Sequence, residues 1–188
     1  MIQDPGSGEV VSPTVLVTPP AGLENIVAMF GDINRYIRPD GSLDAHWRED
    51  FLVVVNLPFP LRLAWDHTRT VSRMTCHHKM AEIFASVFSQ IQSRDLQAKI
   101  ASFGGCFSFR RQRTGAPLST HSWGIAVDLN PETNPQGSSG DMDAGIVEIF
   151  RAAGFEWEAI GPARHAILCI FSSALDTKLP VDPTATSR

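Results

Sequence analysis

The sequence has little cysteine, no excess of positive charge and no long apolar run. Its three cysteines are an odd number without zinc-ribbon spacing, so we expect buried free thiols at Cys76, Cys106 and Cys169. A formal net charge of -4 argues against nucleic acid as a main partner. No apolar segment approaches the roughly 20 residues that span a bilayer. These deficits argue against a disulfide scaffold, a nucleic-acid-binding protein and a membrane-spanning protein.

The two ends of the chain differ from its middle in composition. The N-terminal segment lacks the basic and apolar regions of a secretory signal, so we expect synthesis in the cytoplasm without a signal peptide. Residues 1–22 are rich in Pro, Gly, Ser and Thr and are expected to form a flexible arm, and residues 173–188 a tail. Residues 23–172 are enough for one domain with its own core, and we expect a monomer.

Apolar spacing predicts two helices. Thr70 or Ser72 is expected to cap a long helix, whose apolar face comprises Met80, Ile83, Phe84, Val87, Phe88 and Ile91. The sequence "CHHK" falls within this predicted helix, where adjacent side chains diverge, so a structural role is favoured over metal binding there. Asp141 or Asp143 is expected to cap a second helix that ends near Gly154.

Four apolar segments predict strands, and one dense turn signal separates two short segments. The turn is Pro39-Asp40-Gly41. The predicted strands are "FLVVVNLPFPLRLAW", interrupted by its prolines, "FGGCFSF", "GIAVDLN" and "AILCIF". The sequence lacks the regular strand–helix alternation of a doubly wound fold. We therefore predict an α+β domain in which a small antiparallel sheet packs against helices.

The stretch "STHSWGIAVDLN", residues 119–130, carries the most specific chemistry. Ser119 can shape the turn, and Gly124 lets the chain bend. Strand alternation turns Asp128 away from its apolar neighbours, so its carboxylate and the imidazole of His121 are expected to converge. Imidazole nitrogen and carboxylate oxygen are both good zinc ligands, but catalytic zinc generally takes three protein ligands. A local, non-functional His–Asp contact is the alternative.

The pattern Ser119-x-His121-x-x-Gly124-x-Ala126-x-Asp128 resembles the signature of the M15 zinc peptidases. This family includes D-alanyl-D-alanine carboxypeptidases and phage L-alanyl-D-glutamate endolysins. The segments "NLPFPLRLAWD", "FGGCFSFRRQRTG" and "GDMDAGIVEIFRAAGFEW" resemble the endolysin branch in the same order, so that the resemblance covers residues 45–172. It implies the M15 fold, Zn²⁺ as cofactor and peptidoglycan stem peptides as partners, with action at the cell wall in phage or prophage lysis.

The resemblance also assigns roles to residues. It implies that His121 and Asp128 are zinc ligands, and that an upstream arginine holds the substrate and the developing oxyanion. Arg110 is the first choice for that catalytic role, because a guanidinium suits an anionic intermediate. The candidate substrate-binding residues are Arg113, Ser119 and Trp123.

The C-terminal part of the family pattern departs from expectation. The family places an acidic general base and then a histidine ligand after the position of "GFEW". This chain has His165 in the acid's place, Leu168 in the histidine's place and Cys169 in that of the following aromatic residue. His165 could serve as ligand or base, Cys169 could supply a thiolate, and Glu156 or Glu158 could act as base. We therefore predict a zinc-dependent peptidoglycan peptidase or, alternatively, an impaired domain that binds without cleaving.

Overall fold

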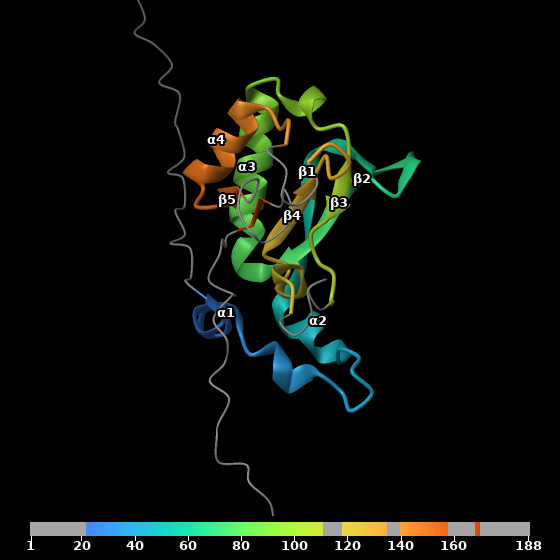
Figure 1. Cartoon of the computed structure of the whole chain (residues 1–188), viewed down its shortest axis with the longest axis vertical. Helices are drawn as coiled ribbons and strands as arrows, with labels where there is room; N and C mark the ends of the chain where they lie inside the picture. Colours follow the sequence, from blue (N-terminus) through green and yellow to red (C-terminus); the bar gives the residue numbers. More distant parts are fainter. Residues whose placement is uncertain (1–21, 111–117, 135–139, 158–167, 170–188) are drawn as a thin grey trace, which may run out of the picture.

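The computed structural model describes residues 22–110, 118–134, 140–157 and 168–169 (Figure 1). The α-helices are α1 (Gly22–Phe30), α2 (Ala45–Phe51), α3 (Ala81–Ser93) and α4 (Ala144–Ala152). The 3₁₀ turns are η1 (Ile33–Tyr36), η2 (His78–Met80), η3 (Gln97–Lys99) and η4 (Thr120–Trp123). The strands are β1 (Leu52–Leu63), β2 (Asp66–His77), β3 (Phe103–Gly105), β4 (Ala126–Leu129), β5 (Glu156–Trp157) and β6 (Leu168–Cys169).

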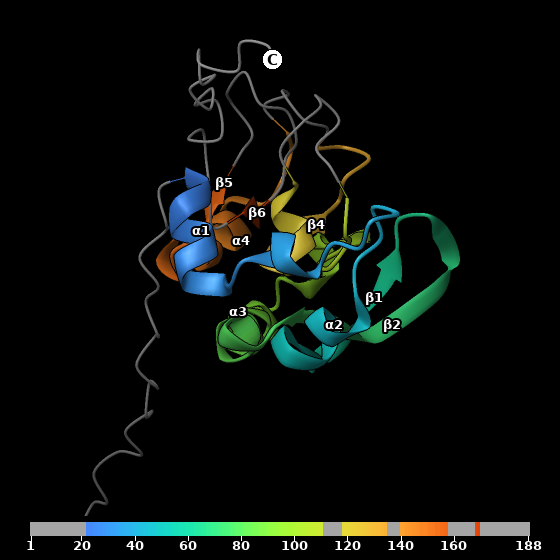
Figure 2. The same cartoon turned by 90° about the horizontal axis from the view of Figure 1, so that it is seen from below.

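The strands form one sheet in the order β2-β1-β3-β4-β6-β5. β1 and β2 make a long antiparallel hairpin at one edge, while α4 and β5 lie at the opposite end of the molecule (Figures 1 and 2). The predicted α+β class is confirmed. The sheet is mixed rather than purely antiparallel, because β1 and β3 run parallel. The chain leaves the hairpin through α3 and returns on the other side of β1, and such a crossover makes a parallel pair.

Helix α3 covers one face of the sheet and forms the centre of the core. Its predicted apolar face is confirmed, since five of its side chains are buried: Ile83, Phe84, Val87, Phe88 and Ile91. The expected start at Thr70 or Ser72 is wrong, because both residues belong to β2. Pairing with β1 over the whole hairpin outweighs their capping preference, and the helix begins only after η2.

The two prolines of β1 do not end the strand. Register passes directly from the Asn56–Arg73 pair to the Leu61–Val71 pair, so Pro58 and Pro60 lie in an irregular stretch between regular pairings. Proline has no N–H to donate to a ladder, and a bulge is one of the few places in a sheet that tolerates it. The expected interruption is therefore a local irregularity within one 12-residue strand.

Helix α4 has the predicted boundaries. The side chain of Asp143 accepts a hydrogen bond from the backbone N–H of Gly145 at 2.9 Å and caps the helix. After the helix, Gly154 adopts a φ of 90°, a conformation that favours glycine.

In the described part of the chain, no helix is long and apolar enough to cross a membrane.

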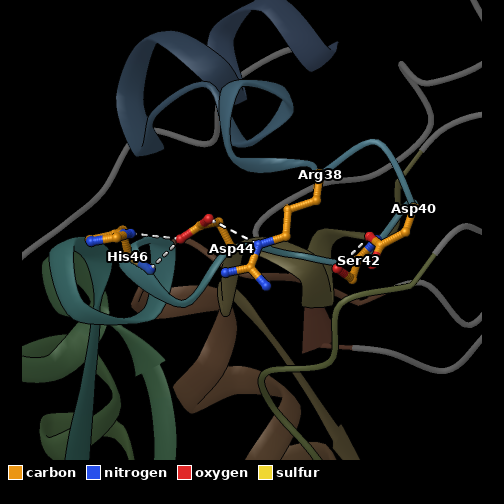
Figure 3. Close-up of polar contacts among 5 residues, drawn as sticks. All are labelled: Arg38, Asp40, Ser42, Asp44 and His46. Atoms are coloured by element: carbon orange, nitrogen blue, oxygen red, sulfur yellow. Dashed lines mark hydrogen bonds and ion pairs between the residues drawn. The ribbon is translucent and has the colours of Figure 1, made fainter.

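A polar network fixes the predicted turn before α2 (Figure 3). The Asp40 carboxylate accepts hydrogen bonds from the Ser42 N–H and hydroxyl, while Asp44 pairs with Arg38 at 3.0 Å and with the His46 ring at 2.7 Å. Asp44 also caps α2, and the backbone N–H of His46 contributes most to holding the pKa of this carboxyl well below its usual range. The Asp44 carboxylate in turn raises the pKa of His46.

His77 fastens the N-terminal segment to the sheet. Its ring Nε2 lies 3.0 Å from the carbonyl oxygen of Phe30, and its Nδ1 accepts a hydrogen bond from the Lys79 N–H. Burial lowers the pKa of His77 to about 4, so the ring is neutral near pH 7. A structural role for this histidine is confirmed, although His77 ends β2 rather than lying in a helix. The free thiols of Cys76 and Cys106 are buried as predicted, and the Cys169 side chain lies outside the described residues.

Candidate metal site

The turn that presents His121 is shaped by a serine and a glycine. The Ser119 hydroxyl caps η4 by accepting a hydrogen bond from the His121 N–H at 3.4 Å. Gly124 ends η4 in the left-handed conformation, with a φ of 69°. A Cβ atom at Gly124 would lie 2.9 Å from the backbone nitrogen of His77. The Gly124 carbonyl accepts a hydrogen bond from the N–H of the same residue, His77. Glycine is required because η4 lies directly against the end of β2.

The imidazole of His121 is buried and oriented by a backbone carbonyl. The side chain is only 2% exposed, and Nδ1 lies 2.7 Å from the carbonyl oxygen of Cys106. A carbonyl can only accept, so Nδ1 must carry the proton in this contact. In the neutral ring, Nε2 then carries no proton and has a free lone pair that can bind a metal ion or accept a hydrogen bond. A carbonyl that orients a histidine in this way is typical of metal sites.

Asp128 lies beside that lone pair. Its Oδ1 is 3.2 Å from Nε2 of His121, and its side chain is 16% exposed. Nε2 nevertheless has no hydrogen-bond partner among the described residues. Two acceptors that face each other repel unless a proton or a metal ion lies between them. The pair therefore fits a divalent cation that accepts one imidazole and one carboxylate ligand.

Gly104 provides the space for the Asp128 side chain. A Cβ atom at this position would lie 2.6 Å from the Cβ of Asp128 and 3.4 Å from its Oδ2. Real carbon atoms do not approach this closely. The first glycine of the "GG" pair in β3 therefore allows the carboxylate to face His121.

Arg110 stands at the open side of the pair. Its Nη2 lies 3.9 Å from Oδ2 of Asp128, and its side chain is 40% exposed. Ser122, which is fully buried, holds the backbone of this arginine from both sides. Its hydroxyl accepts from the Arg110 N–H at 3.1 Å and donates to the Arg110 carbonyl at 2.9 Å. Ser122, the residue after His121, therefore fixes the backbone of Arg110 relative to the turn that carries His121.

The other predicted site residues are either buried or outside the described residues. Arg113 and His165 lie outside the described residues, as does the alternative base Glu158. Ser119 is 8% exposed and serves as a cap. Trp123 is 1% exposed, and its indole N–H donates to the Gly31 carbonyl at 2.9 Å. In the described structure the Trp123 side chain is therefore packed in the core, and its predicted contact with substrate stays a prediction.

The described residues bring together His121 and Asp128, the two side chains that the sequence predicts as metal ligands. No group of three His, Cys, Asp or Glu side chains that could hold a metal occurs within them. The register of β6 places Leu168 opposite Val127 and Cys169 opposite Ala126, so this strand runs beside the one that carries Asp128. Glu156 begins β5, which pairs with β6 on the far side from β4.

The stretch around His121 and Asp128 resembles one known protein family. A family model described as D-alanyl-D-alanine carboxypeptidase, of the M15 peptidase group, matches residues 112–159. This stretch contains both His121 and Asp128 and ends before His165. No curated protein and no solved structure matches the chain. The match covers less than half of the chain, so it shows a likeness to the M15 peptidases over this stretch, and this likeness agrees with the α+β fold.

Sequence reasoning missed the residues that orient His121, Asp128 and Arg110. The glycine pair at residues 104–105 was visible as a strand feature, but its contact with Asp128 depends on the register of β3 against β4. The Cys106 carbonyl leaves no trace in sequence, because any residue could supply it. Ser122 could have been suspected only from its place next to His121.

Proposed function

We propose that the chain is a zinc-dependent peptidase that hydrolyses an amide bond in the stem peptides of peptidoglycan. The observation that carries this proposal is the buried, unpartnered Nε2 of His121 facing the carboxylate of Asp128. The family match over this pair supports it. A surface ion pair would not require a buried imidazole whose second nitrogen is fixed by a carbonyl.

Each residue of the site has a role in this proposal. His121 and Asp128 would hold the zinc ion, which supplies Lewis-acid activation of a carbonyl group and of water. Arg110, partly exposed beside Asp128, binds the developing negative charge or a substrate carboxylate. His165 completes the proposed set as third ligand or general base. We also propose that Arg113 and the exposed part of Arg110 contact substrate.

The proposed place of action follows from the substrate. A chain made in the cytoplasm as a monomer would act on the cell wall during phage or prophage lysis. Its partners would be peptidoglycan stem peptides rather than nucleic acid.

The test uses the full chain, loaded with zinc and incubated with purified muropeptides. Released peptides are identified by mass spectrometry. We expect release to stop with a chelator, to return with added zinc, and to be lost in His121→Ala and Asp128→Ala. His46→Ala is the matched control, because His46 also contacts an aspartate but is 74% exposed on the surface. No release by the zinc-loaded chain, or release that survives both ligand substitutions, would refute the proposed activity.

A second candidate is a domain that binds stem peptides without cleaving them. It is favoured by Leu168, whose side chain offers no lone pair at the position where the family has its histidine ligand. Under this proposal the chain binds muropeptides without releasing products. The double substitution His165→Asp with Leu168→His should then restore zinc binding and hydrolysis. Failure of this variant to bind zinc would contradict the view that only these positions are impaired.

A further inference from the structure

One face of the β1–β2 hairpin is open to solvent. Alternate residues of β1 are buried, and the residues between them are exposed. Val54 is 60% exposed, and Arg62 follows it on the same face. Across the hairpin, Arg73 pairs with Asn56, and residues directly opposite on antiparallel strands project to the same side. We call this surface, made by the exposed side chains of β1 and β2, the open face.

The open face is continuous with the candidate metal site. Leu63 pairs with Phe103 and Phe103 pairs with Leu129, and all three side chains are buried in the hydrophobic core. Strand alternation therefore puts their neighbours Arg62, Gly104 and Asp128 on the opposite side.

The predicted clash of a Cβ on Gly104 with the Cβ of Asp128 agrees with this placement. Because Gly104 has no side chain, this residue does not separate the Asp128 carboxylate from the hairpin. A ligand that lies along the sheet can therefore reach both regions at once.

Positive charge is concentrated on the hairpin. β1 and β2 carry three arginines, Arg62, Arg69 and Arg73, against one acidic residue, Asp66. The Asp66 carboxylate accepts hydrogen bonds from Thr68 and is also close enough to Arg69 to interact with its charge. Among the described residues, Arg62 and Arg73 form no ion pair. The whole chain has a formal net charge of -4, so this local excess is not a general property of its surface.

We propose that the open face binds the peptidoglycan polymer away from the bond that is cleaved. Arg62 and Arg73 contact carboxylates of the acidic stem peptides, while the reacting amide lies at His121 and Asp128. This inference rests on the proposed function and deepens it. The guanidinium fork matches carboxylates, and an extended acidic polymer fits a surface that runs from the site to the sheet edge. The chain's negative net charge disfavours nucleic acid as the occupant.

The test measures binding of the full chain to insoluble peptidoglycan that has been stripped of other wall polymers. Sedimentation is carried out with zinc and, separately, with a chelator, so that binding is measured with and without turnover. The variant is Arg62→Gln with Arg73→Gln. The matched control is Arg94→Gln with Arg151→Gln, which removes the same charge from exposed positions on the helical layer.

We expect binding to be about tenfold weaker in the hairpin variant, because two exposed charge pairs with the polymer are lost. The control should bind as the parent chain does. Added salt should weaken binding of the parent chain more than that of the hairpin variant. Equal binding by the hairpin variant would overturn the proposal, provided that circular dichroism shows it folded. Binding to DNA or anionic vesicles in place of peptidoglycan would also overturn it.

The proposed activity fails separately from this proposal. Arginine-dependent binding without peptide release would leave the open face as the polymer-binding surface and refute the peptidase. Peptide release with full binding by the hairpin variant would do the reverse.

Discussion

Replacement of Gly124 by alanine tests the packing that positions the candidate metal site. Alanine costs about 1 kcal/mol in the left-handed conformation that Gly124 adopts. Its Cβ would also press on the backbone of Cys76 and on the nitrogen of His77, which cannot move without disturbing β2. The His77 N–H would also lose its hydrogen bond to the carbonyl of residue 124. Leaving this buried donor without a partner costs a further ~1–3 kcal/mol of stability. We therefore expect about 3 kcal/mol of destabilisation in total.

Urea unfolding followed by circular dichroism measures this cost, and Gly41→Ala is the matched control. Gly41 has a φ of 81° but nothing within 4 Å of its missing Cβ. It should therefore lose only the conformational contribution of about 1 kcal/mol. If the two variants were equally destabilised, the close approach of η4 to β2 would not be what requires glycine at position 124.

Three further predictions concern single substitutions and pH. Gly104→Ala should displace Asp128 by more than the roughly 0.2 Å that metal coordination tolerates. Zinc affinity measured by titration should therefore fall at least about tenfold. An unchanged affinity would refute the close contact between residue 104 and Asp128. Ser122→Ala should release the backbone of Arg110 and raise KM for muropeptides while zinc content stays the same; a loss of zinc instead would show that Ser122 acts on the ligands. The pKa of His77 is about 4 in the folded chain and about 6.5 when unfolded, so the unfolded chain takes up a proton first as pH falls. Stability should therefore decrease from pH 6.5 to pH 4, by up to about 3 kcal/mol, and His77→Gln should flatten that part of the urea-unfolding profile; an equally steep profile in the variant would contradict it.

Features that depend on local pattern could be predicted from the sequence. The apolar spacing in α3 and the cap at Asp143 each determine a structure within a few residues. The convergence of His121 and Asp128 was also predictable, because strand alternation and one turn suffice to bring them together. The α+β class followed from the absence of a regular strand–helix alternation.

Features that depend on distant pairing could not be predicted. Thr70 and Ser72 have the capping side chains of a helix start, but their backbone is taken up by pairing with β1. The burial of Trp123 depends on a distant contact as well, because its indole N–H donates to the carbonyl of Gly31, more than 90 residues away in the sequence. The parallel pairing of β1 and β3 likewise depends on how the chain crosses over the sheet.

The proposed metal site is tested by the zinc content of the purified full chain, measured by elemental analysis after dialysis against dilute zinc. The buried Nε2 of His121 facing Asp128 predicts one zinc ion per chain, retained in His46→Ala and lost in both His121→Ala and Asp128→Ala. A chain that holds no zinc, or one that keeps its zinc when both residues are replaced, would contradict the assignment of this pair as metal ligands.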